Sequence, residues 1–315
     1  GALMPKPKAR GAAADNPLGV TADPVGPARV VMGRRRVGGR RVLEEKVGNA
    51  TWSVIALADH RIDAVEEIWL ENEQVTWNPT TGEVSSAPWK NGTAASVWIW
   101  AYDGSQTTAP AELLAALPAL GSDFIGLDTA YLVVKVDPPR TNHFRDLFGQ
   151  LATLDVTAVV RGARVYDPRE VGQDPGDPST WAWSANAALV QAAHLIHPLG
   201  VNLSHTEVDW DAVADAADAC DVAVALAGGG TEPKYEAHGL WTSDERHEEV
   251  MDRIRTAHAG GVVREGLKYR VWSGVWTASA HTVSTDWLAG PIKGQDRKPR
   301  AERIRGRVAF WRGVT

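Results

Sequence analysis

The chain has 315 residues, of which 44% are hydrophobic and 23% charged, and a formal net charge of −6. This composition is typical of a globular protein, and the length favours two or three domains. The negative charge gives no overall attraction to nucleic acid or to anionic membranes. No run of about eighteen apolar residues occurs, so no membrane span is expected.

Two residue counts limit the function further. Cys220 is the one cysteine, which excludes an intramolecular disulfide framework, a four-thiolate zinc site and an iron–sulfur cluster within one chain. Tryptophan occurs 14 times, against 4 Phe and 5 Tyr. Because tryptophan favours large flat contacts, this excess predicts packing in sheets or at protein interfaces.

The first half of the sequence reads as an arm followed by a β-rich domain. Residues 1–28 are rich in Pro, Gly, Ala and Lys without apolar periodicity, and predict an extended arm. Alternating apolar residues then predict strands, and the run before Pro118 predicts a short helix. The predicted strands are two within 28–45, meeting near Gly38, then 51–62, 65–77 folded back near Asn72, 97–102, 130–136 and 154–166, and the helix is 111–117.

The stretch "RGARVYDPRE" (161–170) ends this pattern, because Asp167-Pro168-Arg169 stops a strand before an open loop. Helical periodicity follows over 184–197, 208–224 and 243–261, the last with Ser243 as its expected cap. Trp181 and Trp183 are expected to pack this insertion against the β-rich domain. Strand periodicity returns near Leu267.

The sequence therefore predicts an α+β fold: a β-rich domain, a three-helix α-rich insertion and the start of a second β domain. The expected boundaries are 1–28 for the arm, 29–166 for the β-rich domain, 167–266 for the insertion and 267–315 for the beginning of the second β domain.

Candidate catalytic and metal sites are weak. His194, His197 and His205 suggest a three-histidine metal site, but Pro198 ends the helix and no carboxylate stands at helical spacing. The glycines of "ALAGGGTEPK" (225–234) lack the Gly-Lys-Ser/Thr context of a phosphate loop, which favours a turn. No nucleophile elbow is present. We therefore expect no catalytic residue, no metal and no organic cofactor.

Arginine clusters and tryptophan strands are the remaining candidate surfaces. One reading of the arginines is a phosphate-binding face, and the other is a solvated or inter-subunit face, which the acidic net charge favours. The candidate inter-subunit or lumen residues are Arg34, Arg35, Arg36, Arg303, Arg305, Arg307, Trp98 and Trp100.

Several of these segments, in their order and spacing, resemble one family. The segments are "VVMGRRRVGG" (30–39), "RGARVYDPR" (161–169), "TWAWSANAALVQAAHLI" (180–196), "VDWDAVADAADACDVAV" (208–224), "GGGTEPKYEAHGLWT" (228–242) and "VMDRIRTAHAGGVVREGLKYRVWSG" (250–274). Together they resemble the tail-tip hub, or central-fibre (host-specificity) proteins, of lambda-like long-tailed bacteriophages. The resemblance covers residues 28 to 310 and is most specific over 161–275.

The resemblance implies a structural virion protein without enzymatic activity, at the distal end of the phage tail. Such a hub closes the tail tube, takes part in host attachment and opens for passage of phage DNA. Its implied partners are two further copies of itself in a homotrimer, and the distal tail, tape-measure and other tail-tip proteins. Members of the family run longer, so we expect that part of such a chain is present here, or that the fibre function lies in another stretch or chain.

Two alternatives belong to other classes. The tryptophans and acidic residues also suit a carbohydrate-active or glycan-binding protein, although no carboxylate pair stands out. The arginine-rich strands also suit a nucleic-acid-binding module, whose affinity would fall steeply with salt.

Overall fold

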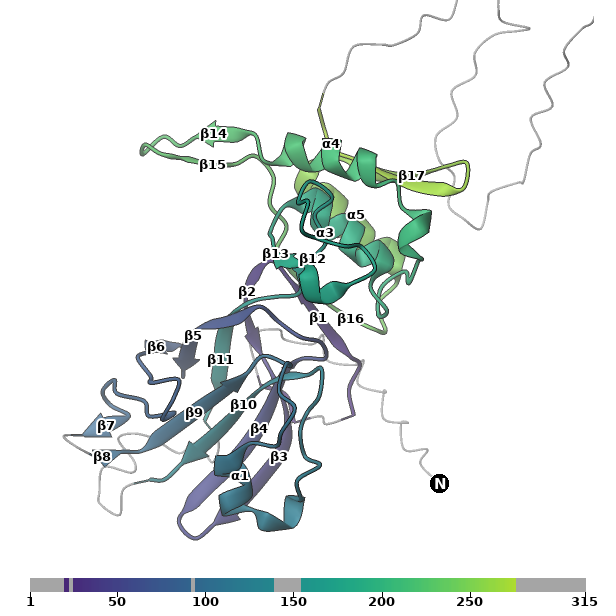
Figure 1. The fold of residues 1–315 in the computed structure, drawn as a ribbon. Helices are drawn as coiled ribbons and strands as arrows, with labels where there is room; N and C mark the ends of the chain where they lie inside the picture. Colours follow the sequence, from purple (N-terminus) through teal and green to yellow (C-terminus); the bar gives the residue numbers. More distant parts are fainter. Residues whose placement is uncertain (1–19, 23–24, 92–93, 139–153, 276–315) are drawn as a thin grey trace, which may run out of the picture. The chain divides into compact units, whose positions relative to one another are not determined.

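The computed structural model describes residues 20–22, 25–91, 94–138 and 154–275. Strands dominate the first part of the chain and helices the second, so the fold is α+β, as predicted (Figure 1). The strands of the first part are β1 (Arg29–Met32), β2 (Arg34–Gly38), β3 (Arg40–Val47), β4 (Ala50–Ala58), β5 (Ala64–Leu70), β6 (Glu73–Val75), β7 (Lys90–Asn91), β8 (Ala94–Ala95), β9 (Val97–Tyr102), β10 (Ala130–Val136) and β11 (Val156–Arg161).

Two antiparallel four-stranded sheets form the β-rich part, one in the order β3-β4-β10-β9 and the other in the order β2-β11-β5-β6. Side chains of both sheets contribute to one hydrophobic core, with Ile55 and Leu132 from the first and Ile68 and Val160 from the second. The two sheets therefore bury one face each against the other.

The first sheet is also buried on its opposite face. Because side chains alternate along a strand, Ile55 of β4 lies in the core shared by the sheets, whereas Trp52 and Val54 lie in a second core. The second core is completed by Leu113 of helix α1 (Ala111–Ala116) and by the 3₁₀ turn Pro118–Leu120. Burial on both faces explains the long apolar runs of these strands.

The remaining elements follow β11. They are β12 (Arg164–Val165), β13 (Ala182–Trp183), α3 (Ala187–Ile196), α4 (Trp210–Cys220), β14 (Ala223–Ala225), β15 (Thr231–Pro233), β16 (Gly239–Thr242), α5 (His247–His258), β17 (Gly261–Glu265) and β18 (Lys268–Trp272). Helix α3 is buried along its length and packs against α4, α5 and β18. Asn186 caps α3 by accepting from the amides of Ala188 and Leu189, and Asp209 caps α4.

Strand β1 joins the two parts. It pairs antiparallel with β16, which comes from the helical part of the sequence. Its alternation places Val30 and Met32 in the core of α3, α4 and α5, and Val31 in the core shared by the two sheets. At Gly33 the backbone turns with a positive φ of 63°, and the chain continues as β2 in the second sheet.

Some predicted elements differ from the structure. The segment 28–45 forms three strands, because the turn at Gly33 separates β1 from β2. The helix predicted over 208–224 ends at Cys220, and the residues after it form a hairpin of β14 and β15. The "GGG" segment is the turn of this hairpin, as predicted.

Ser243 is not the cap of α5, which begins at His247 after Arg246. The residues before this helix form a separate turn, in which the Thr242 amide donates to Glu245 Oε1, and the Ser243 hydroxyl accepts from the Ala28 amide.

Two predicted segments fall largely outside the described residues. Most of the predicted arm lies there, and so does nearly all of the second β segment, from residue 276. Strand β18, at the start of that segment, pairs with β17 and places Val271 among the helices. Among the described residues, no helix is long and apolar enough to cross a membrane.

Gly162 permits the close approach of β11 to β1. Its amide donates to the Gly33 carbonyl at 2.7 Å, and a methyl group on its Cα would come within 2.2 Å of the Val31 carbonyl oxygen. We expect Gly162→Ala to lower the free energy of unfolding by about 2 kcal/mol or more, because backbone atoms must move apart. Urea unfolding measures this. The control is Gly172→Ala, where nothing lies within 4 Å, and an equal loss in both variants would contradict the explanation.

Candidate functional site

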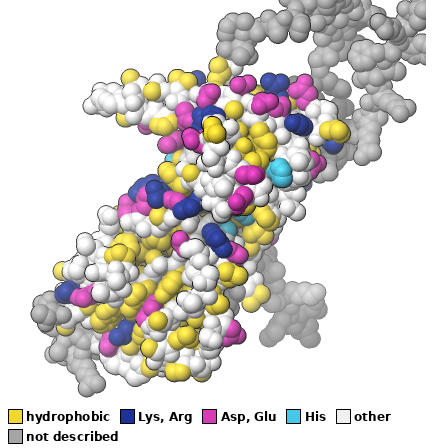
Figure 2. All heavy atoms as spheres, viewed as in Figure 1, with side chains coloured by type: hydrophobic (Ala, Val, Ile, Leu, Met, Phe, Trp, Pro, Cys, Tyr) yellow, Lys and Arg dark blue, Asp and Glu magenta, His cyan; other side chains and the backbone are white. Residues whose placement is uncertain are grey.

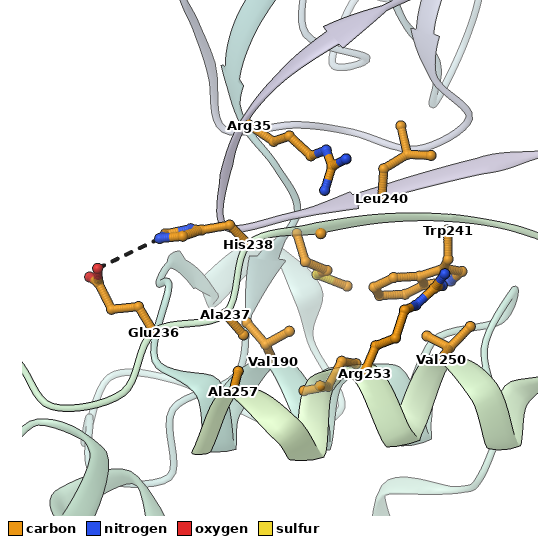
Figure 3. Close-up of a pocket in the computed structure, with 13 residues that line it drawn as sticks. Arg35, Val190, Glu236, Ala237, His238, Leu240, Trp241, Val250, Arg253 and Ala257 are labelled. Carbon is orange, nitrogen blue, oxygen red and sulfur yellow. Dashed lines mark ion pairs between the residues drawn. The ribbon is translucent and has the colours of Figure 1, made fainter. Parts of the chain in front are cut away.

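The candidate site is a cavity of about 490 Å³ where β1, β2, β16, α3 and α5 meet (Figure 3). Its lining combines apolar side chains with charged ones, and basic side chains reach into it. The lining residues are Met32, Arg35, Val190, Glu236, Ala237, His238, Gly239, Leu240, Trp241, Val250, Arg253, Ile254 and Ala257. Met32, Val190, Trp241, Val250 and Ile254 also belong to the hydrophobic core of the helices, so the apolar wall is held rigidly.

Three consecutive arginines on β2 have different surroundings. Arg34 forms ion pairs with Glu66 and Glu67, both at 2.6 Å. Arg36 donates to Asn72 and to Thr157 and stacks on Trp69. Arg35 points to the opposite side of the strand and into the cavity.

Within the described residues, the Arg35 guanidinium has no hydrogen-bond or ion-pair partner, so it is available to a ligand.

A second arginine enters the cavity from the helix side. Arg253 of α5 forms an ion pair with Glu245 at 2.6 Å, which balances its charge. Figure 3 shows the Arg35 and Arg253 side chains on the strand and helix sides, with Leu240 and Trp241 beside them. At the edge, His238 Nδ1 accepts from the Arg34 amide and His238 Nε2 lies 3.6 Å from Glu236. The cavity therefore suits an apolar group that carries a negative charge.

Beside the cavity, buried histidines line helix α3. The His194 ring packs edge-on against Trp241 at 4.7 Å and lies 5.7 Å from the His247 ring. The His197 ring lies edge-on to His60 at 5.8 Å. Burial, aided by neighbouring positive groups, lowers the pKa of His194 and of His197 to about 4.

His60 makes two hydrogen bonds in its neutral form. Its Nδ1 hydrogen donates to the Arg61 carbonyl at 2.7 Å, and its Nε2 accepts from the Val31 amide at 2.9 Å. Burial lowers its pKa. Because protonation at Nε2 would remove the acceptor for Val31, the neutral ring fastens β1 to the loop after β4.

These histidines do not form the metal site considered from the sequence. Among the described residues, no group of three or more His, Cys, Asp or Glu side chains is placed to hold a metal ion. His205 is exposed in a separate turn, whereas His194 is fully buried.

The Asp167-Pro168-Arg169 motif fastens the loop to helix α4. Arg169 contacts Asp167 at 2.7 Å and, through Nη1, the carboxylates of Asp218 and Asp221 near the end of α4. Burial opposes ionisation of Asp167, but its hydrogen bonds and attraction to Arg169 outweigh this and lower its pKa. The strand stop is thus a structural clamp.

The tryptophans that were predicted to lie in sheets or at interfaces pack largely within the chain. Trp98 and Trp100 are half-buried on β9, with Trp100 stacked on Trp52 at 5.9 Å and the Lys135 ammonium 4.3 Å from the Trp98 ring. Among the described tryptophans, Trp272 alone is exposed. A role of Trp98 and Trp100 at an inter-subunit contact stays a prediction.

Of the two loop tryptophans, Trp183 contacts the β-rich part through a hydrogen bond from its ring nitrogen to the Gly33 carbonyl at 3.3 Å. Trp181 donates within its own loop, to the Asp174 carbonyl. Arg303, Arg305 and Arg307 lie outside the described residues.

Sequence reasoning missed several parts of the site. Trp241 and Arg253 come from separate elements, and no local pattern in the sequence joins them to Arg35. Nothing in the local sequence indicated the role of His60, because its hydrogen-bond partner Val31 lies 29 residues away.

Comparison with known proteins gives little further identification. The sequence matches no protein-family model and no curated protein. A solved structure described as "Virion of native gene transfer agent (GTA) particle" aligns with 82% of this chain at 15% identity and a TM-score of 0.48. The aligned region covers 55% of that chain, so this chain spans about half its length. A similarity of this degree does not identify the family or function of the present chain.

We expect Arg169→Ala to lower the free energy of unfolding by about 1–3 kcal/mol, because the variant leaves three carboxylates without their shared partner. Arg169→Lys should recover part of the loss, since one ammonium cannot replace the planar fork. Thermal unfolding gives the values. Arg61→Ala, which breaks an exposed pair with Asp128, is the control and should cost under about 0.5 kcal/mol.

We also expect acid to destabilise the fold between about pH 6.5 and pH 4. The folded-state pKa of His194 is about 4, below the ordinary 6.5, so the unfolded chain binds the proton first. This contribution to stability is present above pH 6.5 and is lost as pH falls towards 4. Urea unfolding at several pH values should show a shallower pH dependence for His194→Gln. Equal slopes for variant and wild type would contradict this role.

Proposed function

We propose that this chain is a structural virion protein: a hub at the distal end of a bacteriophage tail tube, taking part in host attachment and DNA delivery. The assignment comes from the family resemblance of the successive sequence segments over 161–275. The structural observation that supports it is that these segments contact one another in the fold. Residues from segments far apart in the sequence meet around the N-terminus of α3 and hold one another there.

The contacts of this framework are specific. The Asn186 side chain caps α3 and also donates to the Ala217 carbonyl at 2.9 Å, which fixes α3 to α4. The Tyr235 amide donates to the Cys220 carbonyl at 3.1 Å. The Cys220 thiol, whose pKa is raised by burial, lies 3.2 Å from the Ser273 hydroxyl.

Three of the motifs that carry the resemblance thus have a structural role: the clamp of Arg169, the cap of Asn186 and the buried thiol of Cys220. Side chains used in this way favour a scaffold over an enzyme, because catalytic groups need access to a substrate. We therefore propose that the protein has no enzymatic activity.

In this proposal, residues 29–166 and the segment from 267 contribute two β domains to one ring. The helices are an insertion between these two segments of the sequence. Three chains then supply six positions, which matches a three-fold tip to a six-fold tail tube. The distal tail and tape-measure proteins are the proposed neighbours, and phage DNA passes through the opened ring.

The test is a particle reconstruction by electron microscopy, combined with labelling of this chain. We expect three copies at the tail tip, because a closed ring of identical chains repeats one heterologous interface. Each interface should bury well over about 2,000 Å², as permanent assemblies do. One, two or six copies would reject the homotrimer, and absence of the chain from the tail would reject the hub.

A further inference from the structure

The hairpin of β14 and β15 projects from the end of α4, and no other element of the described part of the chain covers it (Figure 1). Every residue from 221 to 234 is exposed, although the segment is rich in apolar side chains. Val222, Val224 and Leu226 are exposed by 53%, 41% and 42%. Figure 2 shows apolar side chains along this projection. An isolated two-stranded hairpin is marginally stable in water, so a second surface is needed to cover it.

The register of the hairpin gives its two faces different chemistry. Val224 pairs with Glu232, and a hydrogen bond from the Leu226 amide to the Gly230 carbonyl continues the ladder. Val224, Leu226 and Glu232 therefore share one face, because paired residues in antiparallel strands project to the same side. The other face carries the small side chains of Ala223 and Ala225.

Charge on the hairpin is restricted to one residue. Between Val222 and Pro233, Glu232 is the single charged side chain in the sequence. Within the described part of the chain it has no hydrogen-bond or ion-pair partner. The exposed face is thus a pair of branched apolar side chains beside one free carboxylate.

The cavity beside Trp241 has the complementary chemistry. The apolar wall that a partner can reach consists of the half-buried Leu240 and Ala257, and the Arg35 side chain reaches into the cavity without a partner in the described residues. An apolar group that packs against such a wall releases water. A carboxylate beside that group would neutralise the Arg35 guanidinium. Arg253, already balanced by Glu245, adds to the positive potential.

We propose that the hairpin of one copy docks into this cavity of a second copy, with Val224 and Leu226 against the apolar wall and Glu232 paired with Arg35. The two surfaces differ, so the contact is heterologous, and repeated contacts close a ring when the rotation allows it. The inference rests on the proposed self-assembly and names the residues that perform it.

A charge exchange tests this contact on the purified full chain. Sedimentation velocity over a range of concentrations gives the association constant. We expect the wild type to associate towards a trimer, and Glu232→Arg and Arg35→Glu each to weaken association by about tenfold or more, since each places like charges together. The association constant of the variant that carries both exchanges should lie within about threefold of the wild-type value, because the ion pair is restored with its charges exchanged.

An apolar test uses the same measurement. Leu226→Glu should abolish association, because it places a carboxylate against the apolar wall. Val171→Glu, at a fully exposed valine outside the hairpin, is the matched control and should leave association unchanged. Thermal unfolding of each variant checks that the fold is kept.

Three outcomes would overturn the inference: a wild type that stays monomeric at every concentration, single exchanges without effect, or a double exchange without recovery. A wild type that associates while the exchanges have no effect places the contact on another surface and leaves the proposed homotrimer standing. The proposed function fails separately, if the tail lacks this chain, even where the hairpin docks as stated.

Discussion

The arrangement of this protein depends on one short strand that supplies two hydrophobic cores. Strand β1 has four residues, and its alternation places Val30 and Met32 among the helices and Val31 between the sheets. Its backbone is held by β16, by the close approach at Gly162 and by the ring of His60. A shift of one residue would exchange its faces and remove apolar contacts from both cores.

The same strand determines the cavity. After the turn at Gly33, β2 begins beside β16, and the alternation of side chains along the strand directs Arg35 away from Arg34 and Arg36 and into the cavity. The cavity wall consists of side chains from the helical core, which cannot move without disturbing α3 and α5. A preformed cavity with a guanidinium that is unpaired among the described residues is suited to binding, since little ordering is needed when a partner enters.

Some large apolar side chains pack within the chain, and others are exposed to solvent. Most described tryptophans are at least half-buried, and Trp52 and Trp100 form part of the second core. These two side chains cover the outer face of the first sheet. The hairpin of β14 and β15 is different, because its valines and Leu226 remain in solvent. Surface of this kind is typical of proteins that function within assemblies.

The local elements follow from the sequence alone: apolar runs predict β4 and β10, alternation predicts β9, and apolar spacing predicts helices α3 and α4, whose caps Asn186 and Asp209 are local. Only the tertiary structure decided which faces meet. The pairing of β1 with β16 joins residues about two hundred positions apart, and the same pairing brings Arg35, Trp241 and Arg253 to one cavity. Periodicity reports which side of an element is apolar, but the surface that covers that side depends on packing between distant segments.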